Sequence, residues 1–182
     1  MIIKLYAQPL GAVVLEILLG TLLWAVLSAM LGRKKPKLWR VLNFCLLAVS
    51  VFAVLFMTVL RRTSGAHELI LIPGYFLQEG KRQPEIYRSL LMNVLLFTPL
   101  GLSLSAVLSK NNSTWRCIGT VTLISLGFSV LVEATQFIGC LGRSEVDDVL
   151  ANTLGALIGA LHVPIGKALQ KRIRINSSAG KR

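Results

Sequence analysis

Glu133 is the residue with the clearest capacity for chemistry, because it is an acid inside an otherwise apolar run. Ser129, Glu133 and Gln136 follow at i, i+4 and i+7, so they share one face of a helix. A charge at mid-bilayer costs about 2.5–3.5 kcal/mol, so such a carboxylate needs a partner or a function. The face predicts a ligand-binding or acid–base site or, alternatively, an acid that hydrogen-bonds a neighbouring helix.

A second polar face begins at Asp148. Asp148, Asn152, Gly155 and Gly159 recur at i, i+4, i+7 and i+11, which forms one stripe along a helix. The two glycines make a GxxxG pattern, which lets another helix approach closely. We therefore predict a close helix contact with a polar pocket at its end.

The residues just before this stripe suggest its start and its counter-charge. Ser144 and Asp147 fit a capping box, with Ser144 as the N-cap, so Asp147 is interpreted as structural. Arg143 is the nearest cation in sequence to Glu133 and Asp148. We expect Arg143 to pair with one of these two carboxylates and offset its desolvation.

A third face carries Asn93, Phe97 and Gly101 at i, i+4 and i+8. Pro99 lies between them and is expected to bend the helix, because it cannot donate a backbone hydrogen bond. Asn93 lies four residues inside the end of its helix, at the same depth as Glu133. We assign Asn93 to the polar site and Phe97, Pro99 and Gly101 to helix packing.

These residues must be positioned by membrane helices. Of 182 residues, 54% are hydrophobic and 15% are charged, and mean hydropathy is +0.67, whereas soluble domains have about 25% charged residues. A bilayer span needs about 20 helical residues. Five apolar stretches meet this length: 10–31, 41–60, 89–108, 117–138 and 147–166. The prediction is an all-α polytopic bundle of about five helices, forming one integral membrane domain over residues 1–182.

Residues 61–88 lie between the second and third predicted helices. Their apolar part, residues 68–76, is too short to span the bilayer and too apolar for a loop exposed to water. We predict an interfacial or re-entrant segment there, with a short amphipathic cover over the bundle as the alternative.

The net charge of +12 comes from basic residues in short clusters between the apolar stretches. This placement argues against a nucleic-acid partner and is typical of loops that set membrane topology. With the N-terminus outside, thirteen Lys and Arg lie on the cytoplasmic side and seven on the other. The bias favours an outside N-terminus and a basic cytoplasmic tail at 167–182, and it places the three polar faces near the exoplasmic side. The three cysteines follow no disulfide or metal spacing.

Three motifs together resemble the VanZ-like family. They are Asn93-x-x-x-Phe97-x-Pro99-x-Gly101, then Glu133-x-x-Gln136, then Arg143 followed by Asp148-x-x-x-Asn152-x-x-Gly155-x-x-x-Gly159. The match runs from about Leu69 to Gly159, within an expected family core of 41–166. The family's N-L-I-P-F segment is incomplete here, where residues 71–74 read Leu-Ile-Pro-Gly. The resemblance implies a membrane protein of a family whose founding member is associated with low-level resistance to the glycopeptide teicoplanin, and it does not specify a biochemical activity.

The function that we predict is binding without catalysis, with neither cofactor nor metal. The expected partners are membrane lipids and a lipid-linked cell-wall precursor or a lipoglycopeptide, and the chain is a candidate homo-oligomer. A membrane enzyme that uses Glu133 and Asp148, and a small proton-coupled transporter, are the alternatives. The predicted polar pocket comprises six residues: Asn93, Glu133, Gln136, Arg143, Asp148 and Asn152.

Overall fold

The computed structural model describes residues 9–63, 65, 67–109 and 113–179. It consists almost entirely of helices, five of which are long and apolar enough to cross a membrane. This confirms the predicted all-α polytopic bundle. The elements, in chain order, are α2 (Leu10–Lys34), α3 (Pro36–Leu55), the π-helical turn η1 (Phe56–Leu60), β1 (His67–Ile70), α4 (Tyr75–Glu79), α5 (Glu85–Leu108), α6 (Thr114–Ile138), β2 (Gly142–Glu145), α7 (Val146–Ala160) and α8 (His162–Ala179).

Several helices begin earlier than predicted from the apolar runs. α3 starts at Pro36, which occupies a first-turn position where its missing N–H costs nothing. α5 starts at Glu85, directly after Pro84. These first turns are polar, so the length of an apolar stretch underestimates the helix.

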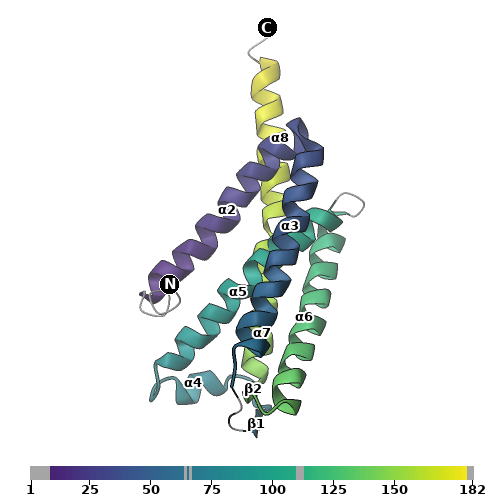
Figure 1. Ribbon diagram of the computed structural model, residues 1–182. Helices are drawn as coiled ribbons and strands as arrows, with labels where there is room; N and C mark the ends of the chain where they lie inside the picture. Colours follow the sequence, from purple (N-terminus) through teal and green to yellow (C-terminus); the bar gives the residue numbers. More distant parts are fainter. Residues whose placement is uncertain (1–8, 64, 66, 110–112, 180–182) are drawn as a thin grey trace.

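The last predicted helix is two helices in the structure. α7 ends at Ala160 and α8 begins at His162, after a turn at Leu161. α8 is helical into the segment predicted as a basic tail, and Figure 1 shows its C-terminal part projecting beyond the other helices. Residues 171–175 of this projection are exposed.

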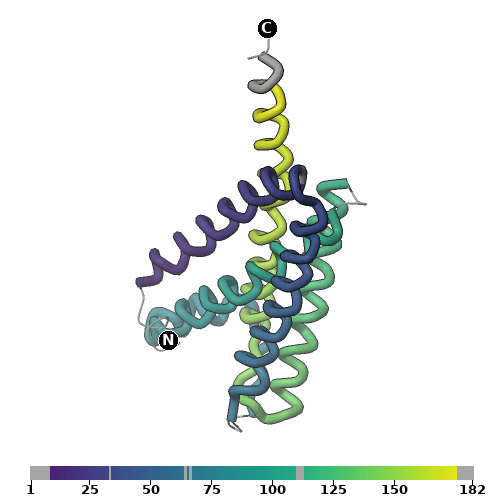
Figure 2. The backbone as a smooth tube through the Cα atoms, turned by 45° about the horizontal axis from the view of Figure 1, so that its top comes forward, coloured from purple at the N-terminus to yellow at the C-terminus, as the bar shows by residue number. Residues whose placement is uncertain are grey.

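The helices pack around α5 and α7, which form the most extensive helix pair of the described structure. α3 packs on α5, and α6 packs on α7. α2 contacts α8 and α5, and it diverges from α3 toward its own N-terminal end (Figures 1 and 2). The central core is a cluster of Val54, Phe97, Leu100 and Val132. Large apolar side chains on the outer faces, such as Leu18 and Leu123, are more than half exposed, as expected of a surface that faces lipid.

The two ends of the bundle differ. One end carries β1, β2 and α4, and the opposite end carries the α2–α3 turn and the projecting α8 (Figure 1). β1 and β2 pair in parallel, with His67 opposite Gly142 and Ile70 opposite Glu145. This pairing, which the sequence did not suggest, connects the 61–88 segment to the start of α7.

Candidate functional site

The contact between α5 and α7 sets the geometry of the site. A Cβ added at Gly155 would lie 2.9 Å from both Cα and the carbonyl carbon of Val94, and closer still to the Val94 oxygen. A Cβ at Gly159 would lie 2.7 Å from the backbone nitrogen of Leu102, and one at Gly101 would lie 2.6 Å from Cα of Ala156. The three glycines therefore allow backbone-to-backbone contact that any larger residue would prevent.

Phe97 and Pro99 lie on α5 beside this contact. Phe97 is fully buried in the central core cluster, and its ring lies 6.0 Å from that of Phe128. Pro99 lies inside α5, and its carbonyl oxygen accepts a hydrogen bond from Ser103 Oγ at 2.8 Å. Both residues belong to the packing that holds α5 in place.

Glu133 lies near the end of α6 and is only 7% exposed. Its Oε2 accepts hydrogen bonds from Ser144 Oγ at 3.0 Å and from the backbone N–H of Glu145 at 3.1 Å. Ser144 Oγ also lies 3.1 Å from the backbone oxygen of Glu133. The carboxylate thus fixes β2 and the start of α7 against the end of α6.

The predicted capping box is therefore wrong. Glu145 occupies the N-cap position of α7 and makes no side-chain cap, because Ser144 is committed to Glu133 instead. Asp147 Oδ1 accepts from the N–H of Gly74 at 2.7 Å, and its Oδ2 accepts from the N–H of Phe76 at 3.0 Å. Asp147 is structural, as expected, but through a turn more than seventy residues earlier in the chain.

Asp148, 8% exposed, occupies the first turn of α7, and the Asn93 side chain of α5 lies near enough to influence its carboxylate. The carboxylates of Glu133 and Glu145 lie near enough to repel it electrostatically, and the Arg62 guanidinium lies near enough to attract it. Asn93, Glu133 and Asp148 therefore come together, as the sequence predicted from their shared depth.

Arg143 pairs with a different carboxylate from those expected. Its Nε lies 3.0 Å from Glu145 Oε1, and the Arg143 side chain is 38% exposed. The cation that acts on both Glu133 and Asp148 is Arg62, which also donates to the backbone oxygen of Leu141 at 3.4 Å. The expected pairing is therefore wrong: Arg143 pairs with Glu145, and the cation near both acids is Arg62, which follows η1 and contacts the turn between α6 and β2.

The side-chain amides of Gln136 and Asn152, both of the predicted pocket, are buried, and in each the nitrogen is hydrogen-bonded within the described structure while the oxygen is not. Gln136 Nε2 donates to the backbone oxygen of Thr58 at 3.0 Å, and Asn152 Nδ2 donates to Ser129 Oγ at 2.8 Å. Gln136 Oε1 and Asn152 Oδ1 have no partner within the described residues. An unsatisfied buried acceptor costs about 1–3 kcal/mol, so each marks a position that a water or a ligand donor would stabilise.

A cavity of about 360 Å³ lies beside Glu133. The walls come from β1 and the residue after it, from α6, and from β2 with the start of α7, and they are mainly apolar. Its lining residues are Leu69, Leu71, Val130, Glu133, Ala134, Phe137, Ser144, Glu145, Val146 and Val149. Of the six predicted pocket residues only Glu133 lines it. The other five lie outside the lining: Asp148 lies near Glu133, Asn93 lies near Asp148, Arg143 pairs with Glu145, and Gln136 and Asn152 hydrogen-bond neighbouring helical segments.

His67 and Cys140 form a contact at the edge of this cavity that the sequence did not suggest. His67 Nδ1 lies 3.1 Å from Cys140 Sγ, and the His67 ring lies 4.2 Å from the ring of Phe137 in an edge-on arrangement. Cys140 has a φ of +50°, which is unusual for a residue other than glycine. Within the described residues, no group of three His, Cys, Asp or Glu side chains has an arrangement suited to a metal ion.

The functional residues that sequence reasoning missed are Arg62, Ser144, Glu145 and His67. No helical spacing connects them to Glu133, because β1 and β2 create their proximity. One available signal was the apolar run at 69–72, whose length and β-branched residues fit a short strand as well as an interfacial segment.

A family model described as VanZ/LLP1 matches residues 42–167 of the chain. This region includes every site residue discussed above and confirms the resemblance that the three motifs indicated. The chain matches no curated protein and no solved structure. Since the matched region covers well over half of its length, this multi-pass membrane chain belongs to the VanZ/LLP1 family.

Proposed function

We propose that this chain is a non-enzymatic protein of the cell envelope that binds an amphiphilic or lipid-linked molecule in the cavity beside Glu133. Through this binding it contributes to low-level resistance to glycopeptides and lipoglycopeptides of the teicoplanin type. One observation carries the proposal. A buried carboxylate, held by Ser144 and the Glu145 amide, lines a cavity whose other walls are mainly apolar.

The groups at the cavity define what would bind. The Glu133 and Glu145 side chains line the cavity and are hydrogen-bond acceptors when ionised. Asp148, which interacts electrostatically with both of these carboxylates, lies outside the lining. Acceptors of this kind favour a head group that donates hydrogen bonds, such as an amine or an amide. The ligand would place that donor at Glu133 and its apolar part along the remaining wall.

Access to the cavity would be from the lipid. Val130 and Leu71 are 49% and 64% exposed, and both line the cavity. Val130 and Val149 belong to spanning helices, so an acyl chain could reach the cavity without leaving the bilayer. The bias of Lys and Arg predicts that this end is exoplasmic, where a glycopeptide or a lipid-linked cell-wall precursor would be encountered.

The test compares teicoplanin susceptibility in a deletion strain that carries wild type, Glu133→Gln or Asp148→Asn. Both substitutions keep the shape of the side chain and remove its charge. A matched control is Glu16→Gln, which makes the same chemical change on an exposed position of α2. We expect wild type and the control to raise the inhibitory concentration and the two site variants to lose most of that protection.

Immunoblots of the membrane fraction establish that all variants insert equally. Full protection by Glu133→Gln and Asp148→Asn at normal protein levels would contradict the proposal. A new product from envelope lipids that forms only with an intact Glu133 would replace binding with catalysis as the function.

A further inference from the structure

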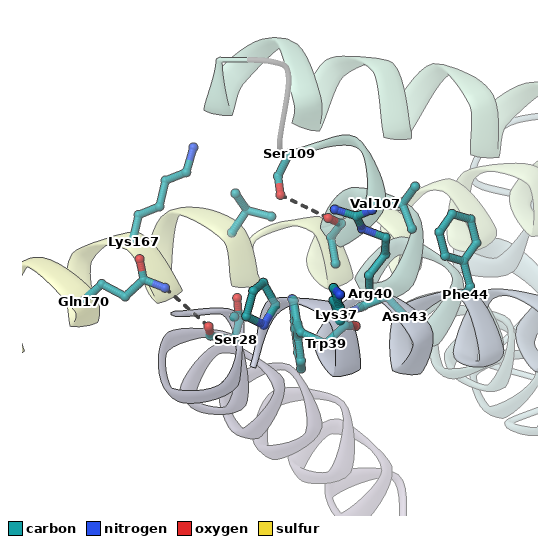
Figure 3. A pocket seen from close by; sticks show the side chains of 14 residues that line it. Ser28, Lys37, Trp39, Arg40, Asn43, Phe44, Val107, Ser109, Lys167 and Gln170 are labelled. Carbon is teal, nitrogen blue, oxygen red and sulfur yellow. Dashed lines mark hydrogen bonds between the residues drawn. The ribbon is translucent and has the colours of Figure 1, made fainter. Parts of the chain in front are cut away.

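A second and larger cavity lies at the opposite end of the bundle, between the α2–α3 turn, the end of α5 and the first turns of α8 (Figure 3). Its volume is about 660 Å³, within the range of about 300–1,000 Å³ that is usual for ligand sites. It shares no residue with the cavity beside Glu133. Nothing in the proposed function uses it.

The charge of this cavity is positive. Lys37 and Arg40 reach it from α3, and Lys167 reaches it from α8. The described residues that line it include no acid, and the ion pairs of the described structure do not involve these three cations. Lys167 Nζ donates to Thr114 Oγ1 at 2.8 Å, which holds it at the junction of α8 and α6. Three cations without counter-charges favour an anionic ligand.

Polarity falls from the end of the bundle toward its middle along the walls that α3, α8 and α5 form. On α3, Arg40 is followed one turn deeper by Phe44, and on α8 Val163 lies one turn deeper than Lys167. On α5 the order is Ser109 and then Val107. One helical turn is about 5.4 Å, so the charged and apolar layers lie at the depths of a lipid head group and of the start of its acyl chain.

The α2–α3 wall is fixed by side-chain interactions. Trp24 and Trp39 pack with ring centroids 5.2 Å apart, and Trp24 Nε1 donates to Asn43 Oδ1 at 3.3 Å. Asn43 Nδ2 donates to the backbone oxygen of Trp39 at 2.6 Å. On the other side, Gln170 Nε2 donates to the backbone oxygen of Ser28 at 3.3 Å, which Figure 3 marks. A cavity shaped before binding loses less entropy when it is occupied.

We propose that this cavity binds one phospholipid with an anionic head group. The phosphate lies among Lys37, Arg40 and Lys167, and an acyl chain lies along Phe44 and Val163. A soluble phosphate compound would satisfy the cations but leave the apolar walls empty. The predicted orientation places the cavity at the cytoplasmic leaflet, where anionic lipids are attracted to basic residues near the membrane surface.

The experiment measures lipid retention. Purified protein in nanodiscs of equal phosphatidylglycerol and phosphatidylcholine is released into a mild detergent, and the retained lipid is counted by native mass spectrometry. The variant Lys37→Gln/Arg40→Gln/Lys167→Gln removes three charges from the cavity. The matched control Lys171→Gln/Arg172→Gln/Arg174→Gln removes three charges from the exposed part of α8, where none lines the cavity.

Wild type and the control are expected to retain one phosphatidylglycerol. The cavity variant should bind it at least about tenfold more weakly, since each basic residue near an anionic surface adds about fivefold in affinity. A charge-preserving variant, Lys37→Arg/Arg40→Lys/Lys167→Arg, should retain it. Equal retention in the cavity variant, or an equal loss in both glutamine variants, would overturn the proposal. So would displacement of the lipid by millimolar glycerol phosphate, because a soluble anion would then suffice.

Discussion

Gly155→Ala should destabilise the bundle by more than its single added methyl group suggests. The new Cβ would lie 2.9 Å from two backbone carbons of Val94, whereas ordinary contacts begin at 3.4 Å. Because the obstructing atoms belong to a helix backbone, no side-chain rotation relieves the clash. α5 and α7 must separate by at least about half an ångström along this contact.

The magnitude follows from two opposing terms. Overpacking a tight interior costs about 1–3 kcal/mol, and a backbone obstacle places this site at the upper end. Replacing a helical glycine with alanine returns about 1 kcal/mol of helix propensity. We expect a net loss of about 2 kcal/mol in the free energy of unfolding. Gly127→Ala on α6 is the matched control, because a Cβ there meets nothing within 4 Å.

The assay is unfolding in mixed micelles of increasing SDS content, followed by circular dichroism. We expect Gly155→Ala to unfold at a lower SDS fraction than wild type and Gly127→Ala to unfold at an equal or higher one. Equal midpoints for wild type and Gly155→Ala would refute the close α5–α7 contact. A matching loss in Gly127→Ala would show that glycine itself, rather than the contact, is what matters.

Three further predictions test the β1–β2 end. Asp147→Ala removes the acceptor for the Gly74 N–H, so hydrogen exchange in the 73–79 segment should accelerate while that in α6 stays unchanged; unaltered exchange in 73–79 would contradict the assigned role. Ser144→Ala removes one of the two donors to the buried Glu133 carboxylate and should lower the free energy of SDS unfolding by about 1–3 kcal/mol. Ser144→Thr, which keeps the hydroxyl, should cost less, and equal losses in the two variants would refute the assigned role of this hydroxyl. An impermeant maleimide should label Cys140 in intact cells, and labelling only after permeabilisation would reverse the predicted orientation.

Much of the helical architecture could be predicted because it depends on local properties of the chain. Apolar runs of sufficient length identified all five spans, but they missed polar turns at the helix ends, such as the first turns of α3 and α6 and the last turn of α2. Helical spacing also grouped Asn93, Glu133 and Asp148, since residues that share an inward face at one depth become neighbours when helices pack into a compact bundle. The role of Gly101, Gly155 and Gly159 in helix packing could be predicted from helical spacing for the same reason.

The rest could not be predicted because it depends on contacts between distant segments. Ser144 and Asp147 form a locally convincing capping pattern, but stronger partners were available: a buried carboxylate on α6 and the free amides of the 74–76 turn. Arg62 replaced Arg143 as the cation near the acids because a short parallel strand pair brings residue 62 to the site. No spacing rule within a single helix contains that information.

The most direct test of the central claim is equilibrium binding of teicoplanin to the protein in nanodiscs. Ala134→Trp fills the cavity beside Glu133 from an exposed position of α6, and Leu131→Trp adds the same ring to an exposed position outside the cavity lining. We predict saturable binding to wild type and to Leu131→Trp, and at least about tenfold weaker binding to Ala134→Trp. The reason is that the new tryptophan ring would occupy the space in which the ligand contacts the apolar walls of the cavity. Equal binding to all three proteins, or no saturable binding to wild type, would contradict the account.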